Sequence, residues 1–196
     1  YAAIWKRDLK HMFKDLEFRS YLIILGVASL IIAVDLIGNM SMSAGEALRY
    51  GIFQVISIQT TTGFATANFD SWPALSKAIL LILMVIGSSA GSTSGGMKVI
   101  RVLTLLKYAR TEIVRVFNPR AMIPMKLQGQ FIPDAVLSRL LGMCAIYVLT
   151  IIVAFLFLSA MGLDLVTAIS AVLAALGNVG PGLGAVGPAV NYFLVP

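Results

Sequence analysis

Long apolar blocks alternate with short polar segments along this chain, and the blocks are of two lengths. Residues 140–161 contain no charged side chain, and a helix of that length can cross about 30 Å of hydrocarbon. Residues 21–37 are nearly as long and carry one acid, Asp35, near their far end. The pattern predicts membrane-spanning helices over 21–37 and 138–161, each followed by a helix that is too short to cross.

The order of these elements occurs twice. Each predicted span is followed by a turn, a short apolar helix and a polar loop with glycine, and the interval from Tyr21 to Gly63 equals that from Ser138 to Gly180. An equal interval of this kind indicates two copies of one supersecondary unit. We expect the short helices over 43–58 and 164–175, and the glycine loops over 60–64 and 177–182.

The first unit continues into an apolar segment that is interrupted. A further helix is predicted over 78–109, but residues 87–96 within it are all glycine, alanine, serine or threonine. Such a run cannot form an unbroken helix that faces lipid, so we expect an intramembrane break there, with Lys98 just beyond it. A broken helix near mid-depth, beside a substrate path, is a known arrangement in transporters.

Composition favours a membrane protein. Hydrophobic residues make up 59% of the 196 residues and charged residues 12%, whereas a soluble domain is nearer half apolar and a quarter charged. The mean hydropathy is +0.91. The chain begins with Tyr1 and has no signal peptide, so we expect it to start inside a longer protein. Its single cysteine, Cys144, allows no internal disulfide.

The net charge of +6 is distributed in a way that predicts orientation. Basic residues gather in 1–20 and in 101–139, and few lie between the two groups. The positive-inside rule therefore places both groups in the cytoplasm, including a linker expected over 110–137, and places 38–76 on the outer side. A nucleic-acid site would need aromatic residues or a recognition motif among the basic ones. The sequence has neither, so no nucleic-acid partner is expected.

Both short helices have recognisable starting residues. Ser43 and Glu46 fit a capping box, in which the serine hydroxyl accepts from a backbone amide and the glutamate reaches back to the cap. Asp164 can cap the second short helix, where its charge complements the positive helix end. If both helices dip into the membrane, each inner end carries a partial charge of roughly −0.5, which favours a cation. The alternative is a pair of interfacial helices followed by ordinary loops.

The first glycine loop reads Thr-Thr-Thr-Gly over 60–63. Beside membrane spans, consecutive carbonyl groups and threonine hydroxyls can replace the hydration shell of a monovalent cation. Gly63 suits such a loop because the carbonyls can point alike only if one residue takes a conformation that a side chain would forbid. This loop is therefore a candidate ion filter.

Three motifs together resemble the Trk/Ktr family of bacterial potassium-uptake proteins, most closely its TrkH and TrkG type. They are SIQTTTGFAT at 57–66, GSSAGSTSGGMK at 87–98 and ALGNVGPGLG at 175–184. The resemblance implies an all-α integral membrane protein with four units of outer helix, pore helix, filter loop and inner helix around one potassium-channel-like pore. This chain resembles the third unit and most of the fourth, without the last inner helix. Two filter loops of four cannot enclose an ion, so these residues alone are not expected to conduct.

The resemblance also implies which residues act. The potassium-binding filter would comprise Thr61, Thr62, Gly63, Asn178, Val179 and Gly180, with K⁺ at Thr61, Thr62, Asn178 and Val179. The gate would be the broken-helix loop, with Gly87, Gly91, Ser92, Thr93, Gly95, Gly96 and Lys98. We also expect the outer acids Glu46 and Asp70 to raise the local cation concentration, though only modestly because charges are screened over about 8 Å.

The function implied is potassium uptake across the bacterial inner membrane by a multi-pass protein in contact with lipid. The resemblance implies a homodimer, a cytoplasmic TrkA-like nucleotide-binding regulatory subunit, and no cofactor in this chain besides K⁺ as the transported ion. The coupling ion stays open, and a sodium-coupled Ktr-type subunit is one alternative. A non-conducting structural subunit is another. An intramembrane serine hydrolase at Ser92 or Ser94 would need His11, the only histidine, as its base. We expect a transporter rather than an enzyme.

Overall fold

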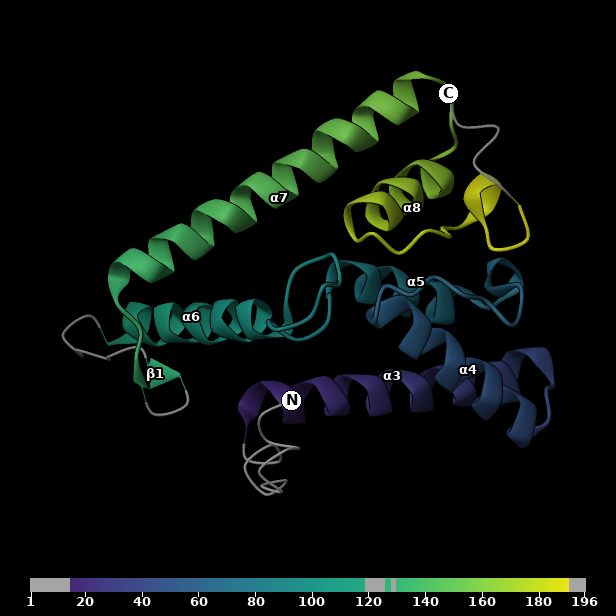
Figure 1. Cartoon of the computed structure of the whole chain (residues 1–196), viewed down its shortest axis with the longest axis horizontal. Helices are drawn as coiled ribbons and strands as arrows, with labels where there is room; N and C mark the ends of the chain where they lie inside the picture. The colour runs from purple at the N-terminus through teal and green to yellow at the C-terminus, as the bar shows by residue number, and fades with distance from the viewer. Residues whose placement is uncertain (1–14, 119–125, 128–129, 191–196) are drawn as a thin grey trace.

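The computed structural model describes residues 15–118, 126–127 and 130–190, which are almost entirely helical (Figure 1). In chain order the elements are α3 (Leu16–Met40), α4 (Ala44–Gln59), η1 (Phe69–Ser71), α5 (Ala74–Val85), α6 (Val99–Phe117), β1 (Lys126–Leu127), β2 (Gln130–Phe131), α7 (Asp134–Ala160), α8 (Leu165–Leu176) and η2 (Gly184–Val186).

Among the described helices, α3 and α7 are long and apolar enough to cross a membrane. No residue of α7 is buried, and large apolar side chains such as Ile146 and Phe157 are 66% and 64% exposed. A helix that is apolar on all sides and uncovered belongs in lipid. The chain is therefore an all-α integral membrane protein.

The two predicted units have the same arrangement of helices. In each, the short helix packs against the span before it, α4 against α3 and α8 against α7. Figure 1 shows α4 folded back beside α3 and α8 folded back beside the end of α7. The reversals occur at Ser41 and Gly162, whose positive φ values of 51° and 93° end the spans. A residue in the left-handed region is a common helix terminator.

The helix after the first unit is broken, as its composition predicts. α5 ends at Val85 and α6 begins at Val99. Backbone bonds close the segment between them at its base: the Gly87 amide donates to the Met97 carbonyl at 2.8 Å, and the Met97 amide donates to the Val85 carbonyl at 2.9 Å. The residues between these bonds, 87–96, are called the broken-helix loop below.

The expected linker over 110–137 is partly helical, which corrects that prediction. α6 runs on to Phe117 and α7 begins at Asp134. Beyond residue 109 the apolar residues become too sparse for a span, but the helix continues because it can be amphipathic outside the hydrocarbon. An exposed pair between Arg115 and Glu112, 2.6 Å apart, lies on this extension. Residues 16–20 of the basic segment 1–20 begin α3, and residues 1–14 lie outside the described part.

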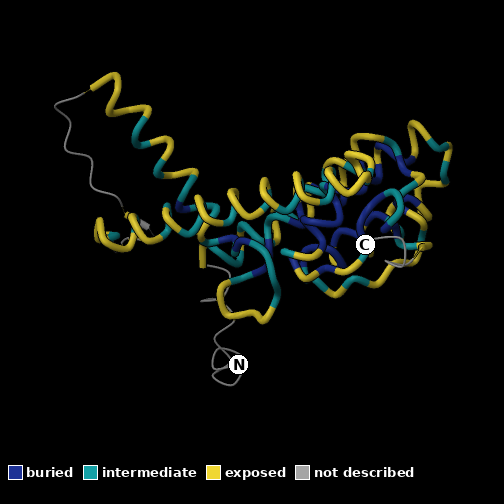
Figure 2. The backbone as a smooth tube through the Cα atoms, turned by 90° about the horizontal axis from the view of Figure 1, so that it is seen from above, coloured by how far each residue is buried: buried dark blue, intermediate teal, exposed yellow. Residues whose placement is uncertain are grey.

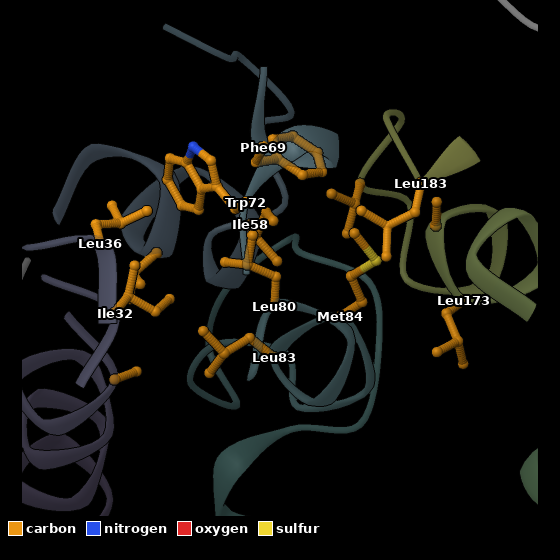
Figure 3. Packing of buried hydrophobic residues seen from close by; sticks show 14 of the residues in the cluster. Ile32, Leu36, Ile58, Phe69, Trp72, Leu80, Leu83, Met84, Leu173 and Leu183 are labelled. Atoms are coloured by element: carbon orange, nitrogen blue, oxygen red, sulfur yellow. The ribbon is translucent and has the colours of Figure 1, made fainter. Parts of the chain in front are cut away.

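The buried core lies among α3, α4 and α5 of the first unit and extends to α8 and the second glycine loop. Figure 2 shows the buried positions concentrated in that part of the molecule, while α7 and the far end of α6 are mostly exposed. In Figure 3, Leu80 and Met84 of α5 lie between Ile32 of α3 and Leu173 of α8. Ile32, Leu80 and Met84 are fully buried. The broken helix is therefore the element that packs the first unit against the second.

Candidate functional site

The two glycine loops are built by the same backbone hydrogen bonds. In the first, the Thr61 amide donates to the Ile58 carbonyl at 3.0 Å, and the Thr62 amide donates to the Ser57 carbonyl at 2.9 Å. In the second, the Asn178 amide donates to Ala175 at 3.1 Å, and the Val179 amide donates to Ala174 at 2.8 Å. Both pairs form a Schellman motif at the end of a short helix. Two different sequences thus adopt one loop structure.

The dihedral angles of the two loops match as well. Thr61 and Asn178 have φ values of 57° and 53°, and the glycines two residues later, Gly63 and Gly180, have φ values of 77° and 105°. Asparagine tolerates the left-handed region, but a β-branched residue such as threonine is a genuine outlier there. Strain of this kind costs about 1–3 kcal/mol and concentrates at functional sites. Thr61 is therefore held in place by its surroundings rather than by its own preference.

The loops touch through their backbones. A Cβ atom built on Gly63 would lie 2.1 Å from the Val179 carbonyl oxygen and 3.3 Å from a ring carbon of Pro181. Only glycine permits that approach without a backbone shift. The structure thus brings Gly63 of the first loop against Val179 and Pro181 of the second, while Thr62, Asn178 and Gly180 are exposed on this chain.

Side chains hold the first loop in its conformation. The Thr60 hydroxyl donates to the Ile56 carbonyl at 2.6 Å and lies 2.8 Å from the Thr62 hydroxyl. The Ser57 hydroxyl donates to the Phe64 carbonyl at 2.6 Å, which ties the chain leaving the loop back to α4. Two threonine hydroxyls of the motif are therefore bound to each other and to α4.

The second loop is held by α8 and, unexpectedly, by an acid of the first unit. The Leu183 amide donates to the Ser170 hydroxyl at 2.9 Å. The Gly184 amide donates to Asp70 Oδ1 at 2.9 Å, although the two residues are 114 positions apart. Asp70 was expected to act as an outer charge that attracts cations. That expectation stays a prediction, and the structure adds that the carboxylate joins the segment after the first loop to the segment after the second.

Both short helices are capped close to the way the sequence predicts. The Glu46 amide donates to the Ser43 hydroxyl at 3.4 Å, and the Ser43 hydroxyl donates to Glu46 Oε2 at 2.8 Å. The Glu46 carboxylate thus accepts from the Ser43 hydroxyl, whereas a capping box predicts that it accepts from the Ser43 backbone amide. In α8 the Thr167 amide donates to Asp164 Oδ2 at 3.1 Å. Hydrogen bonds from Thr167, through its side chain and its backbone, hold the pKa of the Asp164 carboxyl below its usual value.

The broken-helix loop packs directly against the start of the second filter loop. A Cβ atom on Gly95 would lie 2.2 Å from the Gly177 carbonyl oxygen and 3.0 Å from the Asn178 Cβ. Gly177 in turn is close to α5, because its own Cβ would lie 2.7 Å from the Met84 carbonyl oxygen. Gly95, one of the predicted gate residues, is therefore in contact with the predicted filter loop.

The other predicted gate residues surround a cluster of serine hydroxyls. The Ser88 hydroxyl is 2.6 Å from that of Ser92 and also bonds that of Ser94. The Lys98 ammonium donates to the carbonyl oxygens of Ser92 and Ser94 at 3.0 and 2.5 Å. Gly87 and Gly96 meet at the base of the loop, where a Cβ atom built on Gly96 would lie 3.2 Å from the Gly87 nitrogen. Gly91 and Thr93 are exposed at its tip.

Lys98 also bears on the hydrolase alternative. Its ammonium lies 3.1 and 2.9 Å from the Ser92 and Ser94 hydroxyls, which sequence reasoning had paired only with His11. The carbonyl and hydroxyl oxygens of Ser92 and Ser94 all lie within hydrogen-bonding distance of the ammonium, which has three N–H donors, and a charged lysine has no acceptor with which to take a proton. His11 lies outside the described residues. The hydrogen bonds of Lys98 to Ser92 and Ser94 hold the loop together.

Three polar features of this region were not predicted. Asp35, buried in α3, accepts from the Ser76 amide at 3.0 Å and from the Ser76 hydroxyl at 2.5 Å, and so caps α5 from another helix. Gln54 and Gln59 of α4 are fully buried, and their amide groups have no hydrogen-bond partner among the described residues. Glu17, at the start of α3, contacts the tip of the broken-helix loop. Each depends on residues far apart in the sequence.

The family model of TrkH, described as a cation transport protein, matches residues 5–193 of this chain. The chain is 40% identical over 178 residues to the Trk system potassium uptake protein TrkH of Vibrio parahaemolyticus, covering 90% of this chain and 37% of that protein. It is 36% identical over 184 residues to TrkH of Halomonas elongata, with coverage of 94% and 38%. It is 31% identical over 187 residues to TrkG of Escherichia coli, again covering 94% and 38%.

The crystal structure of the potassium transporter TrkH from Vibrio parahaemolyticus has the same fold. The TM-score is 0.83 at 40% sequence identity, over 90% of this chain and 38% of that one. The chain thus spans well under half the length of the relatives that it matches. With the family model matching nearly every residue and the fold agreeing, the chain belongs to the TrkH family of cation transport proteins.

Proposed function

We propose that this chain supplies two filter loops and the gate of a potassium-uptake protein, as the third unit and most of the fourth unit of a four-unit pore. The observation that carries the proposal is the shared backbone of the two glycine loops, which meet at Gly63 and Val179. A pore with repeated units around one axis requires such copies. The names of the relatives, potassium uptake proteins, support K⁺ as the transported ion.

The filter in this proposal comprises residues 61–63 and 178–180. Potassium sheds water against oxygens from four such loops and occupies sites weak enough to leave again. The two short helices end at these loops, so the partial negative charge at their C-terminal ends, roughly −0.5 each, favours a cation there. Thr62 and Asn178 are exposed on this chain, which leaves them available to an ion and to the other units.

The gate in this proposal is the broken-helix loop. Gly95 packs against the base of the second filter loop, and the serine cluster with Lys98 keeps the loop folded in that place. A loop so close to a filter obstructs passage unless it moves. Its small residues and its exposed tip suit a segment that changes conformation.

The full assembly follows the family resemblance. We propose a homodimer in the bacterial inner membrane, with a TrkA-like nucleotide-binding subunit on the cytoplasmic side, where the basic residues of α6 gather. The membrane potential supplies about 2.3 kcal/mol per charge per 100 mV and drives K⁺ inward. In this proposal the chain forms part of an ion transporter and performs no enzymatic reaction.

Growth of a strain that depends on this transporter for potassium tests the filter. The full-length protein carrying both Gly63→Ser and Gly180→Ser should support less growth at low potassium and should lose its preference for K⁺ over Na⁺. Both glycines have positive φ values, so a side chain at either position distorts the loop.

The matched control is Gly142→Ser in α7, because nothing lies within 4 Å of a Cβ at that position. This variant should transport as the unaltered protein does. Unchanged ion preference in the doubly substituted protein, at normal amounts in the membrane, would falsify the assignment of these loops to the filter.

A further inference from the structure

One side chain from another helix reaches the tip of the broken-helix loop. Glu17 lies in the first turn of α3. Its Oε1 accepts a hydrogen bond from the Ala90 backbone amide at 2.6 Å, although the two residues are 73 positions apart. Ala90 belongs to a turn closed by a bond from the Ser92 amide to the Ser89 carbonyl at 3.0 Å. The contact thus joins the start of the outer helix to the end of the loop farthest from its base.

The rest of the loop is held by its own residues. Its base is closed by backbone bonds, and its interior by the serine cluster and Lys98. Residues 90–93 are exposed. Among the described residues outside 87–98, Glu17 has a side chain that accepts a hydrogen bond from the tip. Loss of this bond therefore removes a restraint on the tip without removing any contact within the loop.

The chemistry of the contact favours a bond that can be released. A carboxylate that accepts from a backbone amide makes a charge-assisted hydrogen bond, which is short and stronger than a neutral one. Glu17 is also close enough to attract the Lys98 ammonium electrostatically. Glu17 itself is only half-buried, so water can replace it when the loop moves.

We propose that Glu17 is a positioning residue that holds the broken-helix loop in its closed arrangement against the filter. This inference rests on the proposed gate and adds where the gate is restrained. Because Glu17 lies in the first turn of α3, displacement of that turn would release the tip. Movement at the cytoplasmic end of the outer helix would in this way reach the pore.

Rubidium entry into vesicles that contain the full-length protein tests the restraint. Glu17→Gln keeps the shape of the side chain but weakens the acceptor, and should raise entry about fivefold. Deletion of residues 90–93 should also raise the rate of rubidium entry. Adding Glu17→Gln to that deletion should raise the rate no further, because the tip that Glu17 holds is then absent. Glu112→Gln is the matched control: it removes a carboxylate from α6 that bonds Arg115 and should leave entry unchanged.

A spin label at position 91 reports on the loop independently of transport. No atom of the described residues lies within 4 Å of a Cβ built on Gly91, so we expect Gly91→Cys to be tolerated. Cys144→Ala removes the cysteine of α7, and any others in the full-length protein are replaced likewise. The label should become more mobile in the Glu17→Gln protein. Greater mobility with unchanged rubidium entry would show that the loop is no gate, although the contact exists. A third outcome separates the two proposals. If deleting residues 90–93 speeds rubidium entry, but Glu17→Gln changes neither the entry rate nor the mobility of the label, the loop is a gate and Glu17 does not restrain it.

Discussion

Gly63 and the Val179 carbonyl oxygen lie so close that a Cβ on the glycine would be 2.1 Å from that oxygen. The two residues come from different units and occupy neighbouring positions in loops with the same hydrogen bonds. Their contact is made by backbone on both sides, so no change of side chain at Val179 relieves it. The absence of a side chain at Gly63 thus permits the close approach of the two loops.

Substitutions at the two filter glycines should therefore differ in severity. Gly63→Ala meets both a disfavoured φ of 77° and the Val179 carbonyl, whereas at Gly180, where φ is 105°, no atom of the described residues lies within 4 Å of the added Cβ. We expect Gly63→Ala to lower the rate of K⁺ uptake at least tenfold more than Gly180→Ala, a difference of about 1.4 kcal/mol in the barrier. Uptake rates of the two full-length variants, normalised to protein in the membrane, measure this. Equal rates would mean that the loops are not packed as they are here.

The loop beneath the filter offers a similar pair of glycines. Gly95→Ala places a Cβ 2.2 Å from the Gly177 carbonyl oxygen and must push the broken-helix loop away, whereas Gly91→Ala enters open space at the tip. We expect faster rubidium entry into vesicles for Gly95→Ala and an unchanged rate for Gly91→Ala. If Gly95→Ala reduces protein yield and leaves flux per molecule unchanged, the loop serves the fold and not the gate.

Removal of the Asp70 carboxylate should loosen the second filter loop. Asp70→Ala leaves the Gly184 amide without the acceptor that it has at 2.9 Å, and loss of a hydrogen bond to a charged group costs about 1.5–3 kcal/mol. We expect a lower thermal unfolding midpoint in detergent and a weaker preference for K⁺ over Na⁺. Asp70→Asn keeps an oxygen at that place and should retain part of both properties. Glu46→Gln removes an outer charge elsewhere and should leave the preference for K⁺ over Na⁺ unaltered. If Glu46→Gln weakens that preference as much as Asp70→Ala does, loss of surface charge is the cause and not loss of the hydrogen bond.

The Asp35 carboxylate should contribute to the stability of the fold. Its carboxylate accepts from Ser76 at the start of α5 and from the Asn39 side-chain amide at 2.8 Å. Pro73, at the N-cap of α5, provides no side-chain cap. Asp35→Ala therefore leaves buried donors unpaired, and we expect a loss of about 2 kcal/mol or more in the free energy of unfolding.

Thermal unfolding of the purified full-length protein measures this loss. Ser76→Ala, which removes one donor and keeps the other, should cost less than Asp35→Ala. Equal unfolding midpoints for the Asp35→Ala protein and the unaltered one would show that α5 is capped in another way.

Local features made much of the fold predictable. Ser43 and Asp164 cap the short helices, because an oxygen one residue before a helix needs only the amides that follow it. The run from Gly87 to Gly96 favours a break in a helix, since nine of its ten residues are glycine, serine or threonine, which form helices less readily than alanine. The end of α6 was placed too early because hydropathy marks where lipid ends, whereas hydrogen bonding decides where a helix ends.

The sequence by itself determined the helices, their caps, the break and the two copies of one loop, because each follows from interactions between residues near each other in the chain. Tertiary structure alone decided which loops touch. It brought Gly63 to Val179, Gly95 to Gly177, Asp70 to Gly184 and Glu17 to Ala90. The first three contacts depend on how far the two units approach each other, which is set by the buried side chains of α5 and α8 between them. The fourth depends on how α3 lies against the broken-helix loop within the first unit. No spacing along the chain encodes either arrangement.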